Sequence, residues 1–257
     1  MSAFIAFWKK EWMEQKRSGR LLLLLILFAA FGIMNPAIAK LTPWLLEAMS
    51  ESLAESGMTV GAVQVDAITS WVQFFKNLPM ALIVFVVAES GIFAKEYQAG
   101  TLILSVTKGM PRGGILLAKA GTLSLLWTGL YLLYFLITYS YNAYFWDNGV
   151  AQSLGFAVAA QWLLGLWVLS LIVLFSTIFA TGTGVLLGTG GAYLVAFLVS
   201  LFPRVASVSP CMLADGNSLI YGMEEPSAYL LSVTVTATLT LAAFLLSLPL
   251  LKKRSLG

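Results

Sequence analysis

The sequence contains no histidine and a single cysteine, Cys211. These two scarcities exclude a disulfide within the chain, and they exclude a catalytic triad or a metal site that depends on histidine. The sequence also lacks the Gly-x-x-x-x-Gly-Lys-Ser/Thr phosphate loop. We therefore do not expect this chain to bind ATP by that route, and we expect no catalytic residue, cofactor or metal in it.

Charged residues are scarce as well, at 11% of the 257 residues, against about 25% in an ordinary soluble domain. Hydrophobic residues make up 59%, and the mean hydropathy is +0.87. A soluble protein of this composition would have too little polar surface to present to water. We predict an all-α membrane protein, a single transmembrane domain over residues 1–257, with membrane lipids around it and no nucleic acid as a partner.

Six apolar runs are long enough to cross a bilayer, which takes about 20 helical residues. The predicted spans cover residues of about 21–40, 77–95, 117–140, 154–179, 183–202 and 228–250. Between the first two spans, residues 41–75 are predicted to form an outer amphipathic loop that lies over the membrane as one or two short helices. Thr42-Pro43 suits the start of the first of them.

Lysine and arginine are distributed unevenly among the segments outside the spans. Five precede the first span, four belong to the loop between the second and third spans, and three follow the last span. If these segments are inside, the outer segments hold only Lys40, Lys76 and Arg204. The positive-inside rule thus predicts that both termini are cytoplasmic and that the chain is a multi-pass protein of the plasma (inner) membrane.

The first residues, 2–20, are predicted to form an interfacial helix. Phe4, Trp8 and Trp12 recur every four residues, and basic residues including Arg17 accompany them. In a helix lying flat in the headgroup region, the aromatic rings would enter the lipid while the lysines face anionic phosphates. The alternative is a solvated leader to the first span.

Glu89 is the one acid inside a predicted span. A carboxylate within the membrane costs about 2.5–3.5 kcal/mol on insertion scales, which makes this residue a functional candidate. It could bind a cation, pair with a lysine such as Lys119, or tie its span to the interfacial helix. The other interpretation is a structural ion pair near the interface.

The fifth span contains the pair Gly184 and Gly188, four residues apart. Glycines at this spacing let helix backbones approach closely, so we predict that this span packs in the centre of the bundle. The contact would either change as the protein works or serve static packing.

The largest predicted cytoplasmic loop covers residues 96–116. It has a break at Gly100-Thr101, a short apolar run, a turn around Gly109 and Pro111, and then Arg112 at the start of a helix. A short helix held at the membrane surface could dock into the groove of a partner. From these residues alone, an ordinary re-entry loop is equally consistent.

The segment from Glu96 to Lys119 resembles the signature of the type 2 ABC exporter permease family. In that family an acidic residue precedes Gly-Thr-Leu, followed by a short apolar run, a proline-containing turn, Arg, several apolar residues and Lys. The positions that match without a gap are Glu96, Gly100, Thr101, Leu102, Arg112 and Lys119. The run Lys9-Lys10-Glu11, with Arg17 and Arg20 directly before an apolar run, is similar too. The turn departs from the pattern at Gly109 and Pro111.

The resemblance implies the membrane subunit of an ATP-driven exporter. The loop would be the coupling helix that contacts cytoplasmic ABC ATPase subunits, which would bind ATP and Mg, and the permease would pair with a second copy or a sister permease. The residues implied in ATPase contact are Glu96, Gly100, Thr101, Leu102, Lys108 and Arg112. Aromatic and acidic outer segments suit a hydrophobic or amphipathic substrate, peptide or drug-like, such as an antimicrobial peptide.

Two other functions stay open at this point. A secondary transporter or channel usually carries several ionisable groups at mid-membrane, whereas here there is Glu89 alone, near one end of its span. A membrane immunity protein that works without ATP would need no further motif.

Overall fold

The computed structural model describes residues 3–48, 65–107 and 109–254 of the chain. Within these residues the protein is helical and contains no strand. Six of the described helices are long and apolar enough to cross a membrane, which confirms the predicted fold class. They are α2 (Arg20–Ala48), α4 (Ala67–Glu89), α7 (Arg112–Phe145), α8 (Leu154–Ile178), α9 (Gly182–Ser200) and α11 (Pro226–Lys253).

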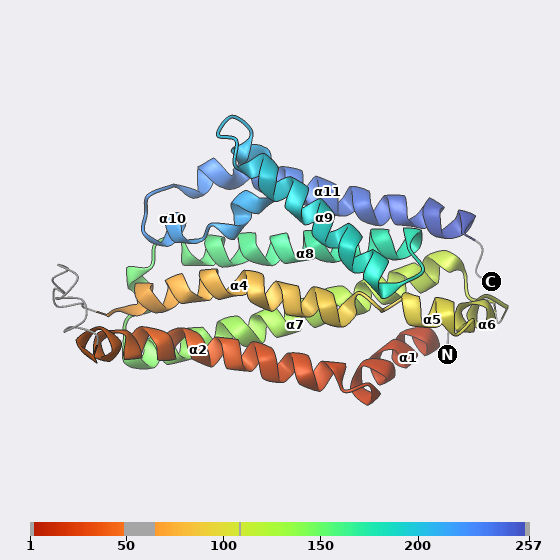
Figure 1. Ribbon diagram of the computed structural model, residues 1–257, viewed down its shortest axis with the longest axis horizontal. Coiled ribbons are helices and arrows are strands. Elements are labelled where there is room, and N and C mark those ends of the chain that lie inside the picture. Colours follow the sequence, from red (N-terminus) through yellow and green to blue (C-terminus); the bar gives the residue numbers. More distant parts are fainter. Residues whose placement is uncertain (1–2, 49–64, 108, 255–257) are drawn as a thin grey trace.

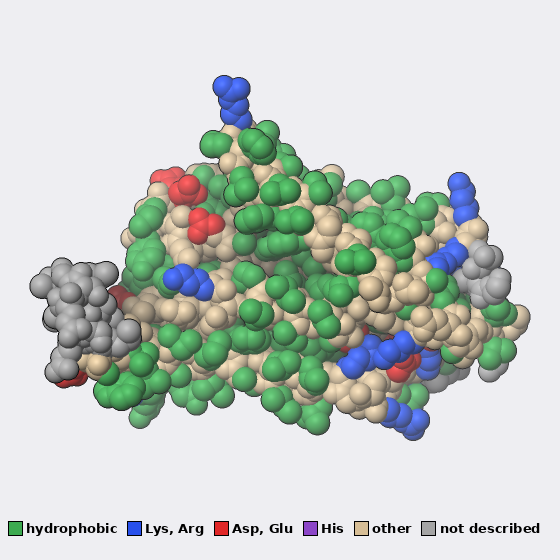
Figure 2. Space-filling model, viewed as in Figure 1, with side chains coloured by type: hydrophobic (Ala, Val, Ile, Leu, Met, Phe, Trp, Pro, Cys, Tyr) green, Lys and Arg blue, Asp and Glu red, His purple; other side chains and the backbone are tan. Residues whose placement is uncertain are grey.

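Both chain termini lie at the same end of the bundle, which we call the terminal end (Figure 1). Three short helices gather there, namely α1 (Ala3–Arg17), α5 (Ala94–Gln98) and α6 (Thr101–Thr107). The connections away from this end contain α10 (Asn217–Ile220) and the 3-10 turns η1 (Asn148–Val150), η2 (Ala206–Val208) and η3 (Pro210–Ala214). On the face shown in Figure 2, hydrophobic side chains cover the middle of the bundle, and lysine and arginine gather towards the terminal end.

The core lies where α4, α7 and α8 meet, and it is rich in aromatic rings. Phe74 of α4 stacks on Tyr134 of α7 with ring centroids 4.3 Å apart. Trp127 of α7 lies against Gly165 of α8, so closely that a Cβ at Gly165 would be 2.0 Å from the indole ring. Its Nε1 donates to the carbonyl of Trp162 at 3.1 Å. A glycine is therefore required where α8 receives this ring.

The first long helix is continuous through two prolines, Pro36 and Pro43, and ends at Ala48. A proline lacks the backbone N–H that would donate to the carbonyl four residues earlier in a helix. The carbonyl of Gly32, one turn before Pro36, therefore has no donor within α2. The hydroxyl of Thr138 on α7 donates to that carbonyl at 3.0 Å. Neighbouring helices satisfy such freed groups in membrane proteins, and this allows the helix to continue.

The predicted outer loop over residues 41–75 is consequently wrong at both ends. No helix starts at Thr42-Pro43, because α2 runs through these residues. At the other end α4 begins already at Ala67, where the side chain of Asp66 accepts from the backbone N–H of Thr69 at 3.1 Å as an N-cap. Residues 49–64 of this loop are outside the described residues.

The position predicted for the glycine-rich span is also wrong. In α9 only Val185 and Thr189 are buried, so this helix lies on the outside of the bundle. Its glycines do meet close neighbours, but these are aromatic rings: a Cβ at Gly188 would be 2.7 Å from the ring of Phe175. A Cβ at Gly184 would similarly approach Phe179 at 2.9 Å. The glycines thus receive rings of the preceding helix and its end rather than a helix backbone.

Candidate functional site: a buried ion-pair network behind the coupling segment

The helix α1 forms where an amino-terminal helix was predicted, but the face it turns inward is largely polar. Phe7, Glu11 and Gln15, at four-residue spacing, are its buried residues. Trp8 and Trp12 are half-buried at the flank, and Phe4 and Arg17 are exposed. A polar face can be buried only if its groups find partners, and the partners come from α4, α5 and α7. Whether the exposed side lies in lipid headgroups stays a prediction.

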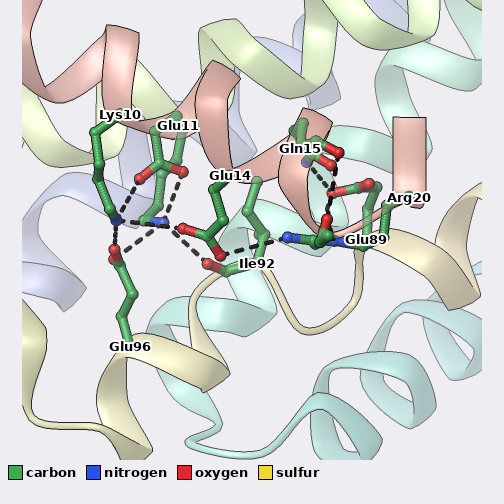
Figure 3. Close-up of polar contacts among 10 residues, drawn as sticks. Lys10, Glu11, Glu14, Gln15, Arg20, Glu89, Ile92 and Glu96 are labelled. Atoms are coloured by element: carbon green, nitrogen blue, oxygen red, sulfur yellow. Dashed lines mark hydrogen bonds and ion pairs between the residues drawn. The ribbon is translucent and has the colours of Figure 1, made fainter. Parts of the chain in front are cut away.

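Lys119 of α7 is the centre of the first set of partners. Its side chain is fully buried, and its Nζ lies 2.9 Å from a carboxylate oxygen of Glu11 and 3.0 Å from one of Glu96. It also donates to the carbonyl of Ile92 at 2.9 Å. Lys10 contacts Glu96 from the other side and lies 3.0 Å from Glu11 (Figure 3). Two ammonium groups and two carboxylates thus join α1, α5 and α7.

Glu89, at the end of α4, is the centre of the second set. Its side chain is fully buried and accepts a hydrogen bond of 2.7 Å from Gln15 Nε2. The guanidinium of Arg20, at the start of α2, lies 3.4 Å from the same carboxylate and 3.4 Å from Glu14 (Figure 3). Of the interpretations open from the sequence, this geometry supports a tie between the span and the amino-terminal helix. The carboxylate pairs with Arg20 rather than with Lys119.

Three carboxylates in this region, those of Glu11, Glu14 and Glu96, have oxygens within 4.8 Å of one another, a spacing that could hold a metal ion. Lys10 is within 4.0 Å of all three, and Lys119 contacts two of them. The ammonium groups already supply the positive charge that a cation would bring. We therefore interpret the cluster as an ion-pair network that holds helices together.

The coupling segment, by which we mean α5 and α6 with the turn at Gly100 between them, is attached to this network. Gly100 has φ +64°, a left-handed conformation that glycine adopts without strain. Beyond the turn, Leu102 is buried in a cluster with Phe7 and Met110. The exposed residues of α6 are Thr101, Ile103, Leu104 and Thr107.

These positions change the roles of several predicted contact residues. The side chains of Glu96 and Leu102 point into the protein, where they hold the segment and do not form its outer surface. Thr101 is on the outer surface, and Lys108 is outside the described residues. The sequence interpretation missed Glu11 and Gln15, although their four-residue spacing from Phe7 on one helix face was a usable signal.

Arg112 makes contacts within the chain, and its predicted contact with an ATPase stays a prediction. Its guanidinium nitrogen lies within 3.0 Å of the carbonyls of Leu251, Lys252 and Arg254 at the end of α11. Arg254 in turn donates to the last carbonyls of α8 and stacks on Tyr97 of the coupling segment, 4.0 Å from its ring centre. Cations at the ends of helices satisfy free carbonyls and the helix dipole. Arg112 therefore fastens the end of α11 to the start of α7.

Away from the network, a cavity of about 760 Å³ lies between α4 and α9. Val168 of α8 contributes to its lining, and so do Cys211 and Ala214 of η3. Most of the lining is apolar, with Leu82 and Val86 on one side and Leu186 on the other. Burial raises the pKa of the Cys211 thiol to about 11. This is the size and character of a site for a small apolar molecule.

The sequence of this chain is similar to that of known membrane proteins. A family described as "ABC-2 family transporter protein" matches residues 5–249. A relative from Bacillus subtilis (strain 168), the uncharacterized transmembrane protein YxlG, is 26% identical over 224 residues, which cover 82% of this chain and 81% of that protein. The family match extends from α1 through the network and coupling segment into α11. The chain therefore belongs to the ABC-2 transporter family, as a multi-pass membrane protein that forms the permease subunit of an ABC transporter.

Proposed function

We propose that this permease is the membrane half of an ATP-driven exporter in the plasma membrane, and that its coupling segment receives the movement of a separate ATPase. ATP and Mg would bind to the ATPase subunits. The observation that carries the proposal is the attachment of the coupling segment to the spans: Glu96 of α5 is ion-paired with Lys119 inside α7 and with Lys10 of α1. A push on α5 and α6 would thus be transmitted to two other helices, α7 and α1.

The outer surface of the coupling segment supports a docking role. Ile103 and Leu104 are exposed side by side on α6, at the end of the bundle where the basic residues gather (Figures 1 and 2). The charge distribution favours a cytoplasmic position for this end, and exposed apolar side chains on a short helix there would be covered by a partner's groove. Behind them, Leu102 anchors the helix to the bundle.

The cavity between α4 and α9 supports a hydrophobic or amphipathic substrate, peptide or drug-like, taken from the cytoplasm or the inner leaflet. A second copy of the chain, or a sister permease, would complete the transport pathway. Glu89, on which an ion-coupled transporter would depend, is engaged by Gln15 and Arg20. This engagement favours a structural role for the carboxylate and therefore supports the ATP-driven mechanism over the ion-coupled one.

The first test is purification of the full chain from its native membranes in mild detergent, followed by identification of any ATPase that accompanies it. Leu104→Glu should reduce the amount of ATPase recovered at least tenfold, because a charge would be buried in the contact. Leu201→Glu is the matched control: Leu201 is 61% exposed, close to the 59% of Leu104, but follows α9 rather than lying in the coupling segment.

Failure of any ATPase to accompany the wild-type chain, in several detergents and in nanodiscs, would refute the proposal. Equal losses for Leu104→Glu and Leu201→Glu would refute the assignment of α6 as the contact.

A further inference from the structure

Two buried oxygens at the contact between α1 and the end of α4 lack a hydrogen-bond donor. The side chains of Gln15 and Glu89 face one another there, with Gln15 Nε2 2.7 Å from Glu89 Oε2 (Figure 3). The other oxygen of each side chain, Oε1, is buried and has no partner among the described residues. An ionised carboxylate and an amide oxygen can only accept, so neither satisfies the other. Buried polar atoms left in this state are costly.

The ion pairs around this contact include more carboxyl groups than cations. In the described part of the chain they connect three cations with four carboxyls, namely Lys10, Arg20 and Lys119 with Glu11, Glu14, Glu89 and Glu96. If every group carried its usual charge, this largely buried cluster would have one excess negative charge. Such a charge is strongly unfavourable without a counter-charge, and a buried carboxyl takes up a proton instead.

Glu89 is the carboxyl in this cluster that is best placed to hold the proton. Each of the other three carboxyls contacts two cations, whereas the one ion pair of Glu89 among the described residues is with Arg20, at 3.4 Å. Arg20 is also shared with Glu14. The side chain of Glu89 is 0% exposed, so water does not replace the missing cation. The carbonyl oxygen of a neutral carboxyl can still accept from Gln15 and Arg20.

The other elements packed near Glu89 bring no further cation into contact with it. The helices α8 and α9 contain no charged residue. On α7, Lys119 contacts Glu11 and Glu96 and attracts Glu89 only from a greater distance. On α5, Lys95 also attracts Glu89, but its side chain is exposed and its charge is screened by solvent. The remaining cations of α1 near this point, Lys16 and Arg17, are exposed as well.

We propose that Glu89 carries a proton at neutral pH, and that its Oε1–H donates to Gln15 Oε1 while Gln15 Nε2 donates to Glu89 Oε2. This acid–amide pair satisfies both oxygens and leaves three cations opposite three carboxylates. It makes the attachment of α1 to the end of α4 dependent on a proton. Loss of the proton restores the excess negative charge and weakens the contact. The inference goes beyond the proposed function and does not depend on it.

Infrared spectra of the purified full chain in detergent at neutral pH test the protonation directly, because a protonated carboxyl has a carbonyl band apart from those of carboxylates and amides. We expect this band in the wild type and its loss in Glu89→Gln. Glu225→Gln, at the exposed acid that precedes α11, is the control and should leave the band unchanged. Gln15→Leu should move the band to higher wavenumber, because the carbonyl loses its N–H donor. If Glu89→Gln removed no such band, the protonation would be refuted, and an unshifted band in Gln15→Leu would refute the pairing.

Unfolding by SDS as a function of pH is the second measurement. The amide introduced by Glu89→Gln is neutral and can make both hydrogen bonds, so at neutral pH this variant should be at least as stable as Glu225→Gln. Unfolding of the wild type releases the proton of Glu89 to water. Raising the pH between about 6 and 8 should therefore increase the unfolding equilibrium constant of the wild type relative to that of Glu89→Gln, by up to about tenfold per pH unit.

An ionised Glu89 paired with Arg20 gives the opposite results. Glu89→Gln would then be strongly destabilised at neutral pH, and its stability relative to the wild type would not change with pH in this range. Either result would overturn the proposal. Neither measurement needs an ATPase, so their outcome is independent of the export proposal.

Discussion

Replacement of Lys119 by methionine should strongly destabilise the protein, because it removes one of two cations from a buried network. In the wild type, the ammonium groups of Lys10 and Lys119 balance the carboxylates of Glu11 and Glu96, and Lys119 contacts both carboxylates at 2.9 and 3.0 Å. Glu14, which Lys10 also contacts, has Arg20 as a further partner. Methionine preserves the length and packing of the side chain but not its charge. In Lys119→Met, the carboxylates of Glu11 and Glu96 at the junction of α1, α5 and α7 share the single ammonium group of Lys10, which leaves one excess negative charge.

The magnitude follows from what remains in the site. Removing one partner of a buried ion pair typically costs about 3–5 kcal/mol. Lys10 still contacts Glu11 and Glu96 in the variant, so we expect the lower end, about 3 kcal/mol. For a chain of this length each kcal/mol lowers the unfolding temperature by about 2–4 °C, which gives a decrease of about 6–12 °C.

A second substitution separates charge balance from packing. Glu11→Gln in addition to Lys119→Met restores neutrality, with Lys10 and Glu96 left as a pair, so the double variant should be more stable than Lys119→Met alone. Unfolding would be followed by circular dichroism in detergent, as a function of temperature and of added SDS. Lys9→Met, at an exposed lysine of α1, is the control. The reasoning would be refuted if Lys119→Met behaved like Lys9→Met, or if the double variant were less stable than the single one.

Three further predictions concern other contacts. Thr138→Val leaves the carbonyl of Gly32 below the proline without its donor and should cost about 1–3 kcal/mol in the same unfolding assay; a loss below 0.5 kcal/mol would contradict this role. Arg112→Met frees the end of α11 and should increase trypsin cleavage at the carboxyl-terminal lysines several-fold, with an unchanged digest as the contrary result. Alkylation of Cys211 by iodoacetamide should rise about tenfold per pH unit and level off only near pH 11, because the thiolate is the reacting form and burial raises the pKa of this thiol to about 11; a plateau near pH 9 would count against the burial seen here.

The membrane class and the six spans were determined by the sequence alone. Apolar runs of span length, with 11% charged residues in the whole chain, have few alternatives to helices in lipid. The family was recognisable because Glu96, Gly100, Thr101 and Leu102 lie in one short segment. Helix ends next to prolines were less predictable. The first span was predicted to end before Thr42-Pro43, but α2 continues through Pro43. At Pro36 the freed carbonyl of Gly32 is satisfied by the hydroxyl of Thr138, which is remote in the sequence.

Only the tertiary structure decided which charged groups meet. Lys119 and Glu11 are 108 residues apart, and Glu89 and Gln15 are 74 apart, so no local spacing could reveal these pairs. Because a charge buried among helices needs a partner, the contact made in three dimensions sets the role of each residue. Glu96, for example, was predicted to contact a partner protein, but in the structure it is buried and ion-paired with Lys119. The position of α9 was also decided by the tertiary structure. The space beside a glycine can take either the backbone of another helix or an aromatic ring, and beside Gly184 and Gly188 the side chains of Phe179 and Phe175 fill it.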